Sequence, residues 1–76
     1  MNWTAVINSI EPHNTSIRIA VAFNNGIDTV NEDFVASDST HDFAWLQNQV
    51  NAKMIDLTNI YAFKSQLSKG MIISGI

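Results

Sequence analysis

The stretch that decides the fold covers residues 15–36 and reads TSIRIAVAFNNGIDTVNEDFVA. In its first half, large apolar side chains occupy every second position, with small or polar ones between them. This period of two is typical of a strand with one buried face. The sequence therefore predicts a strand over residues 15–24. Its buried face is formed by Ile17, Ile19, Val21 and Phe23.

Asn25-Gly26 follows this strand and predicts a two-residue hairpin turn, because both central positions of a type I′ turn need positive φ. The next strand then covers about residues 27–36. Such a turn sets Val21 opposite Val30. Val30 and Phe34 then share the face of the apolar residues in the preceding strand. Turn chemistry and hydrophobic phase thus agree on a hairpin.

Residues 2–10 also alternate and predict a first strand. Residues 11–14 predict a loop, because proline lacks an N–H and both Asn and His tolerate turn geometry. After the third strand, residues 37–40 predict a linker and a helix start, with Ser39 or Thr40 as the N-cap. Together the three strands predict an antiparallel meander.

Residues 41–69 contain neither glycine nor proline and predict one long helix with Gly70 as its C-terminal cap. Some 28 residues would span about 42 Å against about 30 Å for a nine-residue strand, so the helix should overhang the sheet. A bend or break near Thr58 is the alternative. Residues 1–76 thus predict a single α+β domain, a three-stranded antiparallel meander with one long helix packed on one sheet face. The packing stripe consists of Phe43, Leu46, Val50, Met54, Leu57 and Tyr61.

A second set of apolar side chains predicts contact with other molecules. Trp45, Phe63 and Ile55 lie off the packing stripe, and aromatic residues are enriched in interface cores. Coiled-coil pairing between copies is also open, although lysines fall at two core heptad positions. The apolar tail, residues 71–76, is expected to add an edge strand or to insert into a neighbour, with disorder as the alternative. The predicted interface residues are Trp45, Phe63, Ile55, Met71, Ile72, Ile73 and Ile76.

The composition favours a chain that is packed against neighbours. A 76-residue domain usually needs extra stabilisation from disulfides, a metal or partner subunits. Cysteine is absent and the two histidines are far apart, so oligomerisation or docking remains as the source of that stabilisation. Only 14% of residues are charged, against about 25% in an average soluble domain. A compositional bias of the source is the alternative explanation.

Several functions are excluded by what the sequence lacks. A net charge of −3 cannot form the basic face that nucleic acid requires, and no apolar run reaches the ~18 residues of a membrane span. The N-terminus does not resemble a signal peptide, so we expect the chain to stay in a cytosol until assembly. Nucleotide-binding, zinc-protease and nucleophile-elbow motifs are all missing.

Two polar clusters are better explained by structure than by chemistry. Ser39, His41 and Asp42 are too close on a helix start for a catalytic triad, so capping is expected. The acidic residues of the third strand do not converge on one face and predict a solvated strand edge instead of a metal site. We therefore predict no catalytic, cofactor-binding or metal residue, no small-molecule substrate and no enzymatic activity.

Three features together resemble a known class of protein. They are Asn2-Trp3-Thr4 opening the first strand, the hairpin sequence of residues 25–30, and Asp42-Phe43 followed by Leu46 and Val50 in the helix. This order of elements is similar to that of small accessory proteins encoded among the virion genes of tailed bacteriophages.

The resemblance implies a non-enzymatic structural subunit of the tail, baseplate, neck or capsid. Its partners would be other virion proteins and copies of itself. Its location would be the virion, and the host cytoplasm before assembly. The alternative is a small binding or inhibitor module, such as an anti-defence protein, that docks its acidic face or its helix on a host protein.

Overall fold

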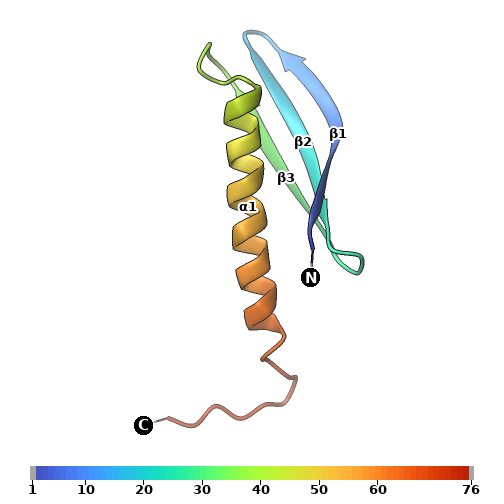
Figure 1. The fold of residues 1–76 in the computed structure, drawn as a ribbon, viewed down its shortest axis with the longest axis vertical. Coiled ribbons are helices and arrows are strands. Elements are labelled where there is room, and N and C mark those ends of the chain that lie inside the picture. The colour runs from blue at the N-terminus through green and yellow to red at the C-terminus, as the bar shows by residue number, and fades with distance from the viewer. Residues whose placement is uncertain (1, 76) are drawn as a thin grey trace.

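The computed structural model describes residues 2–75, which form three strands and one helix. The strands form one antiparallel sheet in the order β1-β2-β3, and the helix runs along one face of it (Figure 1). The predicted α+β meander with a C-terminal helix is thus confirmed. The elements are β1 (Thr4–His13), β2 (Ser16–Asn24), β3 (Thr29–Ala36) and α1 (Phe43–Lys64).

The β2–β3 hairpin has a four-residue loop, residues 25–28, where the sequence predicted a two-residue turn. Val21 consequently pairs with Glu32 and not with Val30, so the predicted register is wrong by two residues. The Asn25 side chain explains the longer loop, because its Oδ1 accepts two backbone N–H groups of the loop at 2.7 and 2.9 Å. A shift of two residues preserves the face of each side chain, so Val30 still faces the helix.

β1 continues through Pro12 to His13, although residues 11–14 were predicted to form a loop. Pro12 pairs with Ile17 of β2. β1 is an edge strand, where proline is tolerated because its missing N–H can lie on the unpaired side. The turn to β2 contains Asn14, whose φ of 56° is positive.

The helix begins later than predicted. Its N-cap is Asp42, whose Oδ1 accepts the backbone N–H of Trp45 at 2.9 Å. Neither Ser39 nor Thr40 fills this role. Thr40 instead donates its backbone N–H to Asp38 Oδ1 at 2.8 Å. The helix therefore starts after Asp42 and not after Ser39 or Thr40.

The helix also ends earlier than predicted, at Lys64 and not at Gly70. Tyr61 is the last residue of α1 that packs against the core cluster, and helical propensity alone seldom holds a helix without such packing. Twenty-two residues span about 33 Å, so the predicted overhang shrinks to the last turns (Figure 1). The helix continues through Thr58, so the alternative of a break there is wrong.

The core is small and lies between the apolar stripe of α1 and the face of β2. Among residues 2–75, five side chains are buried: Trp3, Val21, Phe23, Leu46 and Leu57. Partly buried residues of the predicted stripe, such as Val50 and Met54, pack around them. Phe43 was predicted to belong to this stripe and lies beside Val21 and Leu46, but it is 74% exposed.

Candidate interaction surface

The helix lies on the β3 side of the sheet, and both of its ion pairs are made on that side. Lys53 Nζ lies 3.1 Å from Glu32 Oε2 of β3, and Lys64 Nζ lies 3.7 Å from Asp28 Oδ2 of the β2–β3 loop. Within residues 2–75 no ion pair joins α1 to β1, whose Glu11 pairs with a cation of β2. The helix is therefore anchored at one edge, and the face of β1 is left open.

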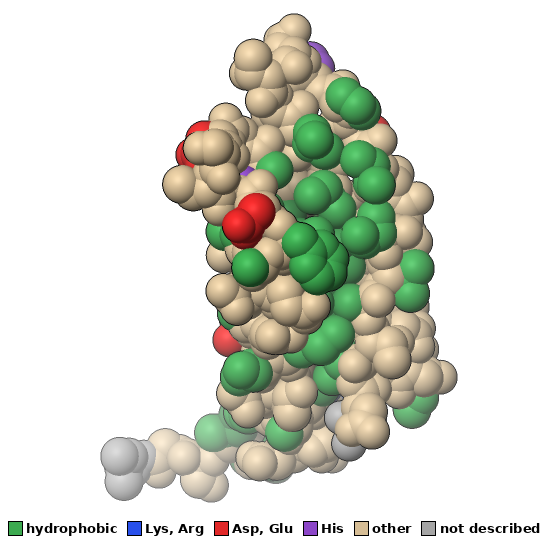
Figure 2. Space-filling view, turned by 45° about the horizontal axis from the view of Figure 1, so that its top comes forward, with side chains coloured by type: hydrophobic (Ala, Val, Ile, Leu, Met, Phe, Trp, Pro, Cys, Tyr) green, Lys and Arg blue, Asp and Glu red, His purple; other side chains and the backbone are tan. Residues whose placement is uncertain are grey.

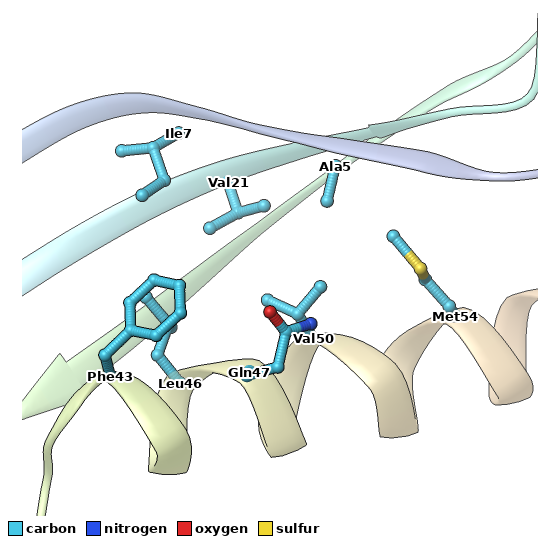
Figure 3. Close-up of a pocket in the computed structure, with 8 residues that line it drawn as sticks. All are labelled: Ala5, Ile7, Val21, Phe43, Leu46, Gln47, Val50 and Met54. Atoms are coloured by element: carbon cyan, nitrogen blue, oxygen red, sulfur yellow. The ribbon is translucent and has the colours of Figure 1, made fainter.

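A groove of about 230 Å³ lies between β1 and α1 (Figure 3). Ala5 and Ile7 of β1 and Val21 of β2 point toward the helix, and the helix side chains point back toward them (Figure 3). The lining is apolar except for one amide. From the helix it includes Phe43, Leu46, Gln47, Val50 and Met54. We call this feature the β1–α1 groove.

Apolar exposure extends beyond the groove. Ile7 is 47% exposed, and Ile10 (61%) and Ile17 (42%) lie further along the same sheet face. Figure 2 shows hydrophobic side chains gathered into a broad patch on one face of the molecule. Contiguous apolar surface of this kind marks interaction sites more often than isolated exposed residues do.

This surface was not predicted from the sequence, although one signal for it was present. A helix is about 10 Å wide, and strands are spaced about 4.8 Å apart, so one helix covers roughly two strands. A three-stranded sheet whose every strand carries apolar residues on one face must therefore leave one strand partly bare. Which strand that is depends on the ion pairs of Lys53 and Lys64, and these are tertiary contacts.

The two edges of the sheet differ in charge. β3 carries Glu32 and Asp33, whereas residues 4–10 of β1 carry no charge. Charges, bulges and prolines are the usual protection of an edge strand against pairing with another chain. β1 has a bulge at Asn8 and a proline at position 12, so its regular, unprotected part is Thr4–Ile7, which adjoins the groove.

The predicted interface residues of the helix lie in two different environments. Ile55 and Phe63 are 63% and 60% exposed, on the side away from the sheet. Trp45, also predicted at the interface, is partly buried within the single chain. Its ring lies against the ring of His41, with centroids 4.4 Å apart, because a long helical side chain leans back toward the N-terminus and the linker.

The tail forms no strand within residues 71–75, so the expected edge strand is absent from the single chain. Its apolar side chains are open to solvent: Met71 is 53% exposed, Ile72 88% and Ile73 82%. Ile76, also predicted at the interface, lies outside the described residues.

The polar clusters have structural partners. His41 Nδ1 accepts the backbone N–H of Ser37 at 2.9 Å, and Asp42 caps the helix. The Thr40 hydroxyl and backbone N–H donate to Asp38 and lower the pKa of its carboxyl below the ordinary value of 3.8. Across residues 2–75 no three His, Asp or Glu side chains gather as a metal site would require. In the same part of the chain no helix is long and apolar enough to cross a bilayer.

The chain exposes more surface than its mass requires. Its accessible surface is 5920 Å², about 1,300 Å² above the ~4,600 Å² expected for a compact monomer of 8.4 kDa. Its radius of gyration of 16.4 Å likewise exceeds the ~11 Å of a compact domain of this length.

Comparison with protein families, curated proteins and solved structures finds no match to this chain.

Proposed function

We propose that this chain is a non-enzymatic structural subunit that works through protein–protein contacts, in a tailed-phage virion. The observation that carries the proposal is the surplus surface of about 1,300 Å² over a compact monomer. A standard interface buries about 800 Å² on each partner, so the surplus is enough for more than one contact.

The chemistry of the exposed surface supports the same function. The side chains around the β1–α1 groove are apolar and uncharged, as in the fully buried centre of an interface. Ile55 and Phe63 are two further exposed apolar side chains of α1 that lie outside the groove. A subunit that contacts neighbours on two sides is suited to a repeating assembly, and the resemblance to accessory virion proteins adds the kind of particle.

The acidic residues of β3 weigh against the alternative of an inhibitor that docks by an acidic face. Glu32 pairs with Lys53, and Asp33 lies 3.9 Å from the guanidinium of Arg18. Both acidic residues of β3 thus lie beside a cation of the same chain, although Arg18 is shared with Glu11.

A mass-spectrometric inventory of purified phage particles tests the proposal. We expect peptides of this chain at a constant ratio to the other virion proteins, through repeated gradient purification. Absence from particles, together with a stoichiometric host protein captured from lysate, would replace the structural subunit with the binding module. Particles spiked with the purified chain after assembly are the control for adsorption.

A further inference from the structure

Two apolar features of this chain lack a partner within it. One is the β1–α1 groove, whose lining contains no charged residue. The other is the tail, residues 71–75, which also carries no charge and is largely exposed. A groove of this chemistry suits an uncharged apolar segment, and the tail is such a segment.

The tail of a given copy does not lead toward its own groove. After α1 the chain makes two turns, in which Leu67 N–H donates to Lys64 C=O and Met71 N–H to Ser68 C=O, each at 3.0 Å. Figure 1 shows the tail leaving the end of the helix on the side away from β1. The tail is therefore available to another molecule.

The open edge of the sheet matches the tail in length. The unprotected part of β1 is Thr4–Ile7, which is about 13 Å long, and the five residues of the tail span about 17 Å when extended. Beyond Ile7 the edge of β1 is less suited to pairing with any second strand. The bulge at Asn8 and the missing N–H of Pro12 interrupt that edge.

We infer that the tail of a second copy adds as a short strand to the edge at Thr4–Ile7. Because side chains alternate along a strand, Met71 and Ile73 share one face and enter the groove beside Ile7. Each copy then gives up surface twice, once by its groove and once by its tail, in keeping with the surplus of about 1,300 Å². The inference rests on the proposed function and names one of its partners, a copy of the chain itself.

Disulfide trapping tests the contact directly, because the chain has no cysteine of its own. Full-length Ile7→Cys and full-length Ile73→Cys are mixed and mildly oxidised, and the mixed dimer is measured on a non-reducing gel. Val35→Cys replaces Ile7→Cys in the control, since Val35 is 50% exposed against 47% for Ile7 but lies on the other sheet face. We expect several-fold more mixed dimer from Ile7→Cys than from Val35→Cys.

Three results of this experiment overturn the inference. Equal yields from Ile7→Cys and Val35→Cys show that the contact is random. A predominant bond between two Ile7→Cys copies shows that β1 pairs with β1. In a further chain that carries both Ile7→Cys and Ile73→Cys, a predominant bond within single molecules shows that the tail folds back on its own groove.

Sedimentation of a chain that ends at Gly70 provides a second measurement. The shortened chain keeps every side chain that is buried among residues 2–75, and its thermal unfolding verifies that it folds. We expect the full chain to sediment at a multiple of its monomer mass of 8.4 kDa and the shortened chain to sediment as a monomer. If both chains sediment as the same number of copies, the tail contact is overturned. The proposed function still stands in that case if the chain is found in particles. Absence from particles overturns the proposed function, whatever the gel shows.

Discussion

The indole of Trp3 packs edge-on against the ring of Tyr61, with ring centroids 4.9 Å apart and planes inclined by 69°. Trp3 immediately precedes β1, and Tyr61 lies in the last turn of α1, so this contact joins the beginning of the sheet to the end of the helix. Trp3 is only 8% exposed, and its Nε1–H is buried with no acceptor within residues 2–75.

Trp3 contributes packing at the cost of an unpaired donor. Trp3→Ala should lower the free energy of unfolding by about 3–5 kcal/mol, as large aromatic truncations do. Trp3→Phe keeps an aromatic ring against Tyr61 and removes the unpaired N–H, so its loss should be less than half as large. Urea unfolding followed by circular dichroism measures both. Equal losses would contradict this prediction, because they would show that the ring kept in Trp3→Phe contributes no packing.

Two nearby positions of α1 should respond very differently to the same change. Leu57 is 3% exposed and lies in the core, so Leu57→Ala should cost about 2–5 kcal/mol of unfolding free energy. Ile55 is 63% exposed on the other side, so Ile55→Ala should stay within about 0.5 kcal/mol. Urea unfolding at low protein concentration compares the two. A large loss at Ile55 would mean that its face is already covered.

The pair of Lys53 and Glu32 should couple the helix to β3. Their side chains are 28% and 41% exposed, so a double-mutant cycle with Lys53→Met and Glu32→Gln should give a coupling of about 0.5–1 kcal/mol that falls in high salt. The same cycle with Asp33→Asn in place of Glu32→Gln is the control. Asp33 lies on the other sheet face, and its coupling to Lys53 should be absent.

The ionisation of Asp38 should make the free energy of unfolding depend on pH. Hydrogen bonds from Thr40 lower the pKa of Asp38 in the folded chain, so the ionised carboxyl stabilises the fold. This contribution is fully present above the unfolded value of 3.8 and is lost as the pH falls through the lowered folded pKa. The difference in unfolding free energy between the wild type and Asp38→Asn should therefore be seen at pH 7 and shrink at pH 2. Asp56→Asn controls for the loss of one charge, and a difference that persists at pH 2 would contradict the assignment.

The sequence alone was sufficient to predict the elements that follow from hydrophobic periodicity. The alternation of Ile17 through Phe23 predicts β2 correctly, and the helical stripe from Leu46 to Tyr61 predicts the face of α1. Both follow from local pattern, because burial of one face needs only the right spacing of apolar residues. Element order and the α+β class follow from them.

Other features could not be predicted, because two local sequence signals of similar strength favour different turn lengths or helix starts. Asn25-Gly26 fits a two-residue turn, but the Asn25 side chain binds loop N–H groups and lengthens it. Asp42 and Thr40 are equally good caps, and Thr40 is engaged with Asp38. The β1–α1 groove lay beyond local pattern altogether, because it depends on where the helix sits across the sheet.

The small core has a consequence for how the amount of this chain is regulated. With five buried side chains in residues 2–75, the folded state has little reserve, and any molecule that covers the groove adds to stability by mass action. If copies make the proposed contact, the melting temperature rises with the amount of protein. A copy without a neighbour would then open more often and be degraded sooner. In that case the fold itself would limit the supply of the chain to the number of places that can hold it.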